Sequence, residues 1–218
     1  MSSKKKDKVI QRYDRWSRYY DAVDTFPGVG RYEKRWRLEA IALLELKGGE
    51  TVLDAGTGSG LILPWIAEAM PSGKLVATDL SEGMLAKARE RVASVMKEGV
   101  EIEIVKDDVE SSSYPDDTFD RIISTFTLTS VPDPKMCVQE LARILKKGGH
   151  LVVLDTGKPT SLVYKLYFPL MRGVAALSGY TYMGRDIIGL IEGCSNLKIL
   201  EVHRFFGGMV YIVVAEKG

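Results

Sequence analysis

The sequence has few of the residues that carry metal or redox chemistry. It contains only two cysteines and two histidines in 218 residues. Cys137 and Cys194 are far apart, so we expect neither a disulfide framework nor a metal site, and we interpret both as small hydrophobic residues. His150 and His203 leave little choice for a histidine base, because His150 begins a predicted buried strand.

The sequence also lacks an excess of charge and lacks long apolar runs. Thirty Lys and Arg against 29 Asp and Glu leave a net charge of +1, which gives no support for nucleic-acid binding. No signal-peptide pattern opens the chain and no apolar run could span a bilayer, so we expect a cytoplasmic protein. The lysines at 4–6 suit either a solvated terminus or contact with anionic lipid. The apolar segment 162–182 suits either a helix packed over the sheet or peripheral membrane contact.

From residue 50 onward, short apolar runs alternate with amphipathic segments. The pattern predicts strands at 51–53, 74–78, 101–105, 119–125 and 150–154, and helices at 61–69, 82–96, 134–145 and 186–192. Residues 146–149 suit a helix C-terminus, and 8–46 predict two helices interrupted at Pro27-Gly28. Two late strands, 197–205 and 209–215, predict an antiparallel pair at the edge of a mostly parallel sheet with helices on both faces.

A glycine-rich segment, Asp54-Ala55-Gly56-Thr57-Gly58-Ser59-Gly60, follows the first of these strands. In an open parallel sheet, ligands bind beyond the carboxyl ends of the strands, where glycines let the backbone approach closely. The N–H groups of the following helix favour an anionic group. Nicotinamide enzymes use such loops too, but Leu61 replaces their third glycine, and Asp54 suits a cationic ammonium or sulfonium better than a pyrophosphate.

Acidic residues follow the next two predicted strands as well. Asp79 can accept hydrogen bonds from both hydroxyls of a ribose, because Ser81 is the better N-cap for the helix that follows. Asp107 and Asp108 follow the third strand, where a carboxylate can accept from an adenine amino group. A solvated turn is the alternative interpretation of that pair.

Four blocks of the sequence resemble class I S-adenosylmethionine-dependent methyltransferases. Residues 52–60 resemble their motif I, 108–120 the stretch that leads to their fourth strand, and 128–134 and 141–149 the next two blocks. The resemblance implies a Rossmann-like α/β fold, with a seven-stranded, mostly parallel sheet, one antiparallel strand and helices on both faces. It implies a single domain, 1–218, with a helical lid (1–48), a cofactor-binding core (49–155) and substrate-side helices with the terminal strand pair (156–218).

Within this superfamily the chain is similar to the ubiquinone/menaquinone biosynthesis C-methyltransferases. The similarity is carried by residues 13–14, 20–21, 30–31, 36–37 and 207–210. It implies S-adenosylmethionine as cofactor and a small, lipid-like acceptor such as a quinone precursor. Residues 128–132 lack the arginine-asparagine pair of the quinone enzymes and, with Leu63-Pro64, also resemble phospholipid N-methyltransferases, so methylation of phosphatidylethanolamine is an alternative. A nicotinamide-dependent oxidoreductase and a non-catalytic cofactor-binding protein are alternatives of other classes.

Carried over residue by residue, the resemblance implies cofactor contacts at Thr57, Asp79, Asp108, Val109 and Thr125. The full predicted cofactor-binding set is Tyr20, Asp54, Gly56, Thr57, Gly58, Gly60, Asp79, Leu80, Met84, Asp107, Asp108, Val109 and Thr125. Methyl transfer from a sulfonium needs alignment and exclusion of water rather than a metal. The catalytic candidates are Tyr20, His203 and Arg172, and Arg172, Tyr180, Tyr182 and Arg185 lie where the family places substrate contacts.

Overall fold

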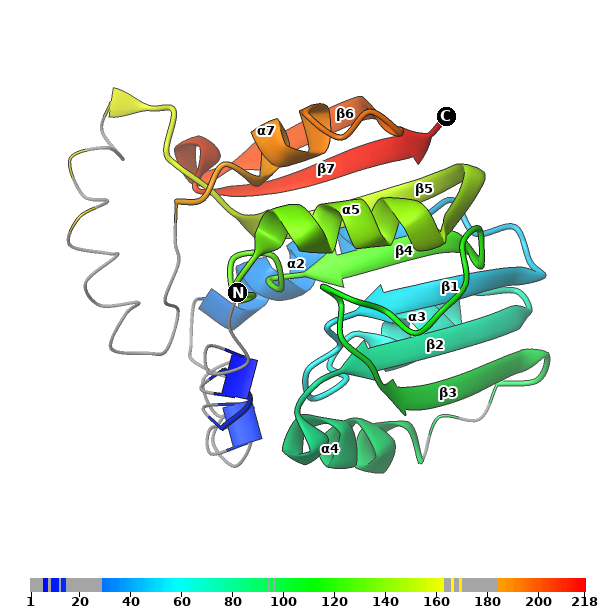
Figure 1. The fold of residues 1–218 in the computed structure, drawn as a ribbon. Helices are drawn as coiled ribbons and strands as arrows, with labels where there is room; N and C mark the ends of the chain where they lie inside the picture. Colours follow the sequence, from blue (N-terminus) through cyan, green and yellow to red (C-terminus); the bar gives the residue numbers. More distant parts are fainter. Residues whose placement is uncertain are drawn as a thin grey trace.

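The computed structural model describes residues 6–7, 9–11, 13–14, 29–93, 95, 97–162, 166, 169 and 184–218. In this part of the chain, seven strands form one sheet in the order β3-β2-β1-β4-β5-β7-β6 (Figure 1). The strands are β1 (Glu50–Ala55), β2 (Gly73–Asp79), β3 (Val100–Lys106), β4 (Phe119–Thr125), β5 (Leu145–Thr156), β6 (Leu197–Phe205) and β7 (Val210–Lys217). Only β7 runs antiparallel to its neighbours in this sheet, so the predicted fold is confirmed.

Helices cover both faces of the sheet. They are α2 (Val29–Ala42), α3 (Leu63–Ala69), α4 (Glu82–Val92), α5 (Pro134–Ile144) and α7 (Ile187–Glu192). Ile41 of α2 and Ile66 of α3 belong to the apolar core on one face, and Val138 of α5 and Ile191 of α7 belong to the core on the other. Burying one such side chain contributes about 1.5–3 kcal/mol, so both layers hold the strand ends in place.

Side-chain caps set where the helices begin. The hydroxyl of Ser81 accepts from the N–H of Met84 at 3.2 Å, which confirms Ser81 as the N-cap of α4. Asp133 accepts from two N–H groups in the first turn of α5, and Asp186 accepts from Gly189 at 3.0 Å in α7. Each cap satisfies N–H groups that would otherwise be unpaired at a helix start.

Several predicted boundaries shift by one or two residues, and two differ by more. Residues 146–149 belong to β5 rather than to the end of α5, because Leu145 already pairs with Phe119 of β4 and the ammonium of Lys146 lies 2.9 Å from the carboxylate of Asp120. Pairing with the neighbouring strand therefore outweighs the local glycine signal. The predicted helix 82–96 ends at Val92.

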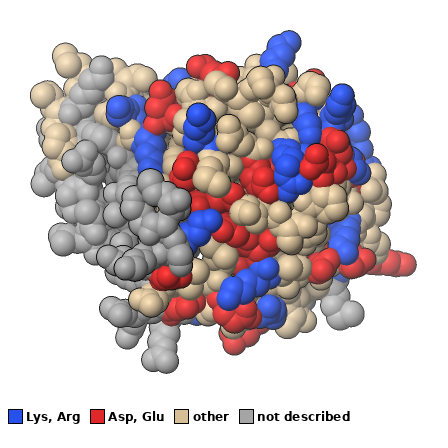
Figure 2. Space-filling model, in the orientation of Figure 1, with Lys and Arg blue, Asp and Glu red and all other residues tan. Residues whose placement is uncertain are grey.

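Other expectations concern the surface and the thiols. Cys137 is buried, Cys194 is half-buried and both are free thiols. No helix in the described ranges is long and apolar enough to cross a membrane. Figure 2 shows basic and acidic side chains interspersed over the described part of one face. Most of segment 162–182 lies outside the described residues.

Candidate functional site

A cavity lies at the carboxyl ends of β1, β2, β3 and β4. Its walls come from the glycine-rich loop after β1, the turn after β2, the loop after β3 and the end of β4. Ten residues of the predicted cofactor-binding set line it: Gly56, Thr57, Gly58, Asp79, Leu80, Met84, Asp107, Asp108, Val109 and Thr125. Parallel strands thus bring residues that are distant in sequence to one edge of the sheet, as the sequence predicted.

Asp54 and Gly60 were also predicted in this set but lie behind the wall. Asp54 is fully buried; one oxygen accepts from the Thr57 hydroxyl at 2.6 Å, and the other has no partner among the described residues. Burial raises the pKa of Asp54 to about 7, although the Thr57 hydrogen bond opposes this rise. Gly60 has φ +72°, and a Cβ there would lie 2.8 Å from the Cβ of Ala88. Both residues therefore support the loop from its rear.

The N–H groups of the glycine-rich loop are already engaged within the protein. Those of residues 56–58 and 60 donate to Thr78, Asp79 and Thr57 at 2.8–3.0 Å. The first N–H of α3 donates to the carbonyl of residue 60 at 3.1 Å. The expectation that the start of this helix offers free donors to an anion is therefore wrong for these groups. The same finding weakens the case for a bound pyrophosphate.

Asp79 and Gly58 both line the cavity and are hydrogen-bonded to each other. One Asp79 oxygen accepts from the N–H of Gly58 at 3.0 Å and the other from that of Ser81 at 2.8 Å. Each carboxylate oxygen can accept a second hydrogen bond, so a diol can still bind. Gly58 has φ +56°, and a Cβ there would meet no atom of the described residues within 4 Å, so they leave the space in front of it open. Burial raises the pKa of Asp79.

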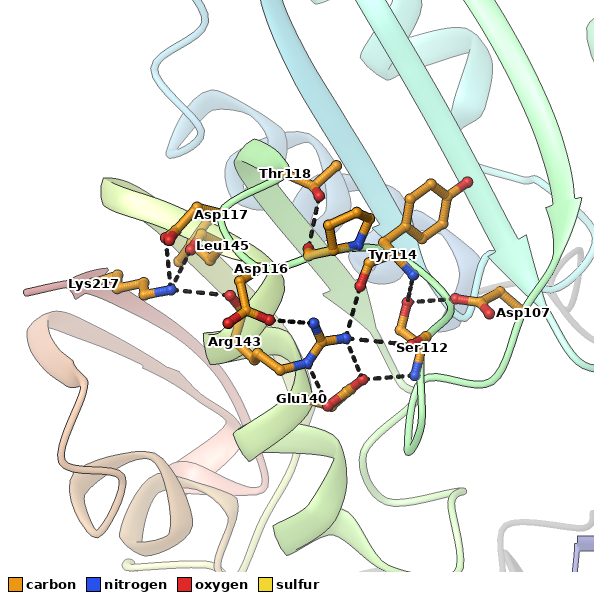
Figure 3. Close-up of polar contacts among 11 residues, drawn as sticks. Asp107, Ser112, Tyr114, Asp116, Asp117, Thr118, Glu140, Arg143, Leu145 and Lys217 are labelled. Atoms are coloured by element: carbon orange, nitrogen blue, oxygen red, sulfur yellow. Dashed lines mark hydrogen bonds and ion pairs between the residues drawn. The ribbon is translucent and has the colours of Figure 1, made fainter.

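A polar network fixes the loop after β3 (Figure 3). Asp107 accepts from the Ser112 hydroxyl at 2.6 Å, so its carboxylate already has a partner in its own loop. Arg143 of α5 donates to the Ser112 carbonyl at 3.3 Å and pairs with Glu140 at 2.6 Å, and Glu140 accepts from the Ser112 N–H at 2.8 Å. This network holds the neighbouring Asp108 at the cavity wall.

The N-terminal residues contact the cavity from a distant part of the sequence. The ammonium of Lys6 pairs with Asp108, and it lies 2.8 Å from the carboxylate of Glu110. Asp14 accepts from the hydroxyl of Ser81. Val9 and Tyr13, between these contacts, line the cavity. The N-terminal segment is thus attached at two points beside the ends of β2 and β3.

The predicted catalytic candidates do not come together in the described structure. His203 lies on β6 and is not among the described residues that line the cavity. Its Nε2 lies 2.8 Å from Glu201 and its Nδ1 3.2 Å from Glu39, and the hydrogen bond with Glu201 raises the pKa of this imidazole. Tyr20, Arg172, Tyr180 and Tyr182 lie outside the described residues. No group of residues in the described ranges could hold a metal ion.

The cavity residues that were given no role by the sequence include Arg37, Phe126 and Thr127. The Thr127 hydroxyl donates to the carbonyl of Gly56 at 3.2 Å, and a Cβ at position 56 would lie 2.3 Å from its methyl group. Thr127 comes two residues after Thr125, so its position at the end of β4 was a usable signal. Arg37 belongs to α2, and only the packing of that helix brings it here.

Known proteins match most of this chain. Residues 53–153 match the family model described as a methyltransferase domain. The chain is 30% identical over 184 residues to a demethylmenaquinone methyltransferase of Shouchella clausii, covering 84% of this chain and 77% of that protein. It is 33% identical to a ubiquinone/menaquinone biosynthesis C-methyltransferase of Geobacter sulfurreducens, with 78% and 69% covered. A solved S-adenosylmethionine-dependent methyltransferase from Aquifex aeolicus superposes with a TM-score of 0.64 at 25% identity, with 84% and 89% covered.

The fold and these matches define an S-adenosylmethionine-dependent methyltransferase. The predicted enzyme class and cofactor are thereby confirmed. The chain belongs to the methyltransferase family that includes the demethylmenaquinone and the ubiquinone/menaquinone C-methyltransferases. The alternatives, a phospholipid N-methyltransferase, a nicotinamide-dependent oxidoreductase and a non-catalytic binding protein, are not favoured.

Proposed function

We propose that this enzyme methylates a small quinone precursor and binds its cofactor in the cavity at the ends of β1 to β4. The observation that carries the proposal is the convergence of the glycine-rich loop, Asp79 and Asp108-Val109 on one cavity. The class of acceptor rests on the names of the relatives, which are quinone methyltransferases.

The residues present fit an adenosyl-sulfonium cofactor. The unused acceptor capacity of Asp79 suits the two ribose hydroxyls, and the open space in front of Gly58 admits the ligand beside it. Asp108 and Val109, one strand further along, would hold the adenine. Thr57 and Thr125, at the ends of β1 and β4, would adjoin the methionine portion.

The remaining members of the predicted set fill supporting roles in this proposal. Leu80 and Met84 would supply apolar surface beside the adenine. Asp107 shapes the loop after β3 through its hydrogen bond with Ser112. Gly56 and Gly60 give the glycine-rich loop its curvature, with φ of +75° and +72°. One Asp54 oxygen has no partner among the described residues, so Asp54 is a buried acceptor behind the loop, and a cationic ligand nearby would favour its ionised form.

When bound, the cofactor would supply an electrophilic methyl group on a sulfonium for transfer to a nucleophilic carbon of the acceptor. The protein's part is to hold the two reactants in line and to exclude water. Segment 1–48 would act as a lid through Lys6 and Asp14, with Val9 and Tyr13 over the cavity. Residues 156–218 would face the acceptor, and the exposed Leu162 and Leu166 suit peripheral contact with a membrane that holds a lipid-like acceptor.

The test is methyl transfer with the full chain. Methyl-labelled S-adenosylmethionine would be incubated with the protein and either a reduced demethylated quinone or phosphatidylethanolamine vesicles. We expect label in the quinone product, with one S-adenosylhomocysteine formed for each methyl transferred. Label in the phospholipid alone would overturn the acceptor class. Cofactor binding without transfer to either acceptor would instead support a non-catalytic protein.

A further inference from the structure

Arg37 is a buried cation on the cavity wall. It is 6% exposed, and it lines the cavity from helix α2. One guanidinium nitrogen donates to Glu33 at 2.9 Å, one helical turn earlier. The guanidinium also lies 5.3 Å from the centre of the Phe126 ring. Glu33 is its only hydrogen-bond partner in the described structure.

This arrangement leaves most of the arginine's hydrogen-bonding capacity unused. A guanidinium has five N–H donors in a planar fork, and the bond to Glu33 engages one nitrogen. A buried charge is costly unless it is paired and hydrogen-bonded. The remaining donors of Arg37 therefore suit an anionic ligand that enters the cavity.

The position of Arg37 identifies which part of the cofactor it would meet. Phe126 directly follows β4, and the charge of Arg37 also acts on Asp54 near the end of β1. Asp108 follows β3, at the opposite end of the row β3-β2-β1-β4. A cofactor with its ribose on Asp79 and its adenine towards Asp108 extends its amino-acid end towards β1 and β4. That end carries a carboxylate and an ammonium, and it would lie near the cationic Arg37 and the Asp54 carboxyl group, whose ionised form has the opposite sign to the ammonium.

Several other donors near the cavity are already engaged among the described residues. The N–H groups of residues 56–58 and 60 are bonded within the protein. Lys6, the other lysine or arginine among the described lining residues, pairs with Asp108 and Glu110 beside β3. Arg37 is thus the described cation available at the methionine end.

We propose that Arg37 binds the carboxylate of the methionine portion of S-adenosylmethionine. The inference rests on the proposed cofactor site and adds to it a residue from α2, outside the core motifs. A planar guanidinium can take a carboxylate through two parallel hydrogen bonds, which a lysine cannot reproduce. Arg37 would thereby also link α2 to the bound cofactor.

Calorimetry with two ligands tests this assignment. Decarboxylated S-adenosylmethionine keeps the adenosine, the sulfonium and the ammonium but lacks the carboxylate. We expect the wild-type protein to prefer S-adenosylmethionine by about 10- to 100-fold, the range of a charged hydrogen-bonded pair. Arg37→Met should lose this preference by weakening only the carboxylate-containing ligand, and Arg37→Lys should retain part of it.

Arg35→Met is the matched control, because Arg35 is an exposed arginine on the same helix. This variant should bind each ligand with an affinity within about twofold of that of the wild-type protein, a much smaller change than the loss of a charged pair would cause. Equal affinity of the wild-type protein for the two ligands would overturn the proposal without any variant. An equal loss of affinity for both ligands in a folded Arg37→Met variant would also overturn it. If neither ligand bound the wild-type protein, the cofactor site itself would be wrong.

Discussion

Replacing Asp79 by alanine should lower the affinity for S-adenosylmethionine by at least about 100-fold, because two charged hydrogen bonds contribute about 1.5–3 kcal/mol each. The variant would lack the acceptor for both ribose hydroxyls. The N–H groups of Gly58 and Ser81 would also lose their hydrogen-bond partner. Isothermal titration calorimetry of the purified variant measures the effect directly. Asp79→Asn, which keeps one acceptor oxygen, should lose less affinity.

The control for Asp79 is Glu101→Ala on the neighbouring strand β3. Glu101 is exposed and pairs with Lys74 at 3.2 Å, away from the cavity. Its removal should leave cofactor affinity unchanged, because exposed ion pairs contribute little. Wild-type affinity in a folded Asp79→Ala variant would show that the ribose does not lie on this carboxylate.

The second large effect is on stability and its dependence on pH. Burial raises the pKa of Asp54 from 3.8 to about 7 in the folded protein. The folded state therefore binds this proton more tightly than the unfolded state, and the stabilisation is lost as the pH rises from about 4 to about 7. The full shift corresponds to about 4 kcal/mol, at about 1.36 kcal/mol per pKa unit. Asp54→Asn should remove this contribution, because the amide carries no charge.

Urea denaturation of the wild-type protein and the Asp54→Asn variant at pH 5 and pH 8 measures this difference. We expect the variant to gain stability relative to wild type as the pH rises. Asp155, whose pKa burial raises to about 6, should add a slope of the same sign to both proteins, so the comparison isolates Asp54. Parallel pH profiles for the two proteins would show that Asp54 is not the titrating group.

Much of this structure follows from local sequence signals. Strand 119–125 and strand 197–205 have the predicted bounds. Each has alternating or continuous apolar residues between residues that favour turns. Ser81 caps α4 as predicted, and the acidic residues after β2 and β3 meet at one cavity. These features depend on short-range chemistry and on the rule that parallel strands end at one edge.

The predictions that failed depend on contacts between distant segments. Residues 146–149 read locally as a helix end, but pairing with β4 places them in β5. The helix after the glycine-rich loop was expected to offer N–H groups to an anion, but its first N–H donates to the carbonyl of residue 60. Arg37 gave no local signal as a ligand residue, because only the packing of α2 on the sheet brings it beside Phe126.

The most direct test of the proposed site is a crystal structure of the full chain with S-adenosylhomocysteine. We expect the ribose hydroxyls on Asp79, the adenine beside Val109 and the carboxylate within hydrogen-bonding distance of Arg37. A nucleoside bound outside the cavity at the ends of β1 to β4, or bound there in the reverse direction, would contradict it.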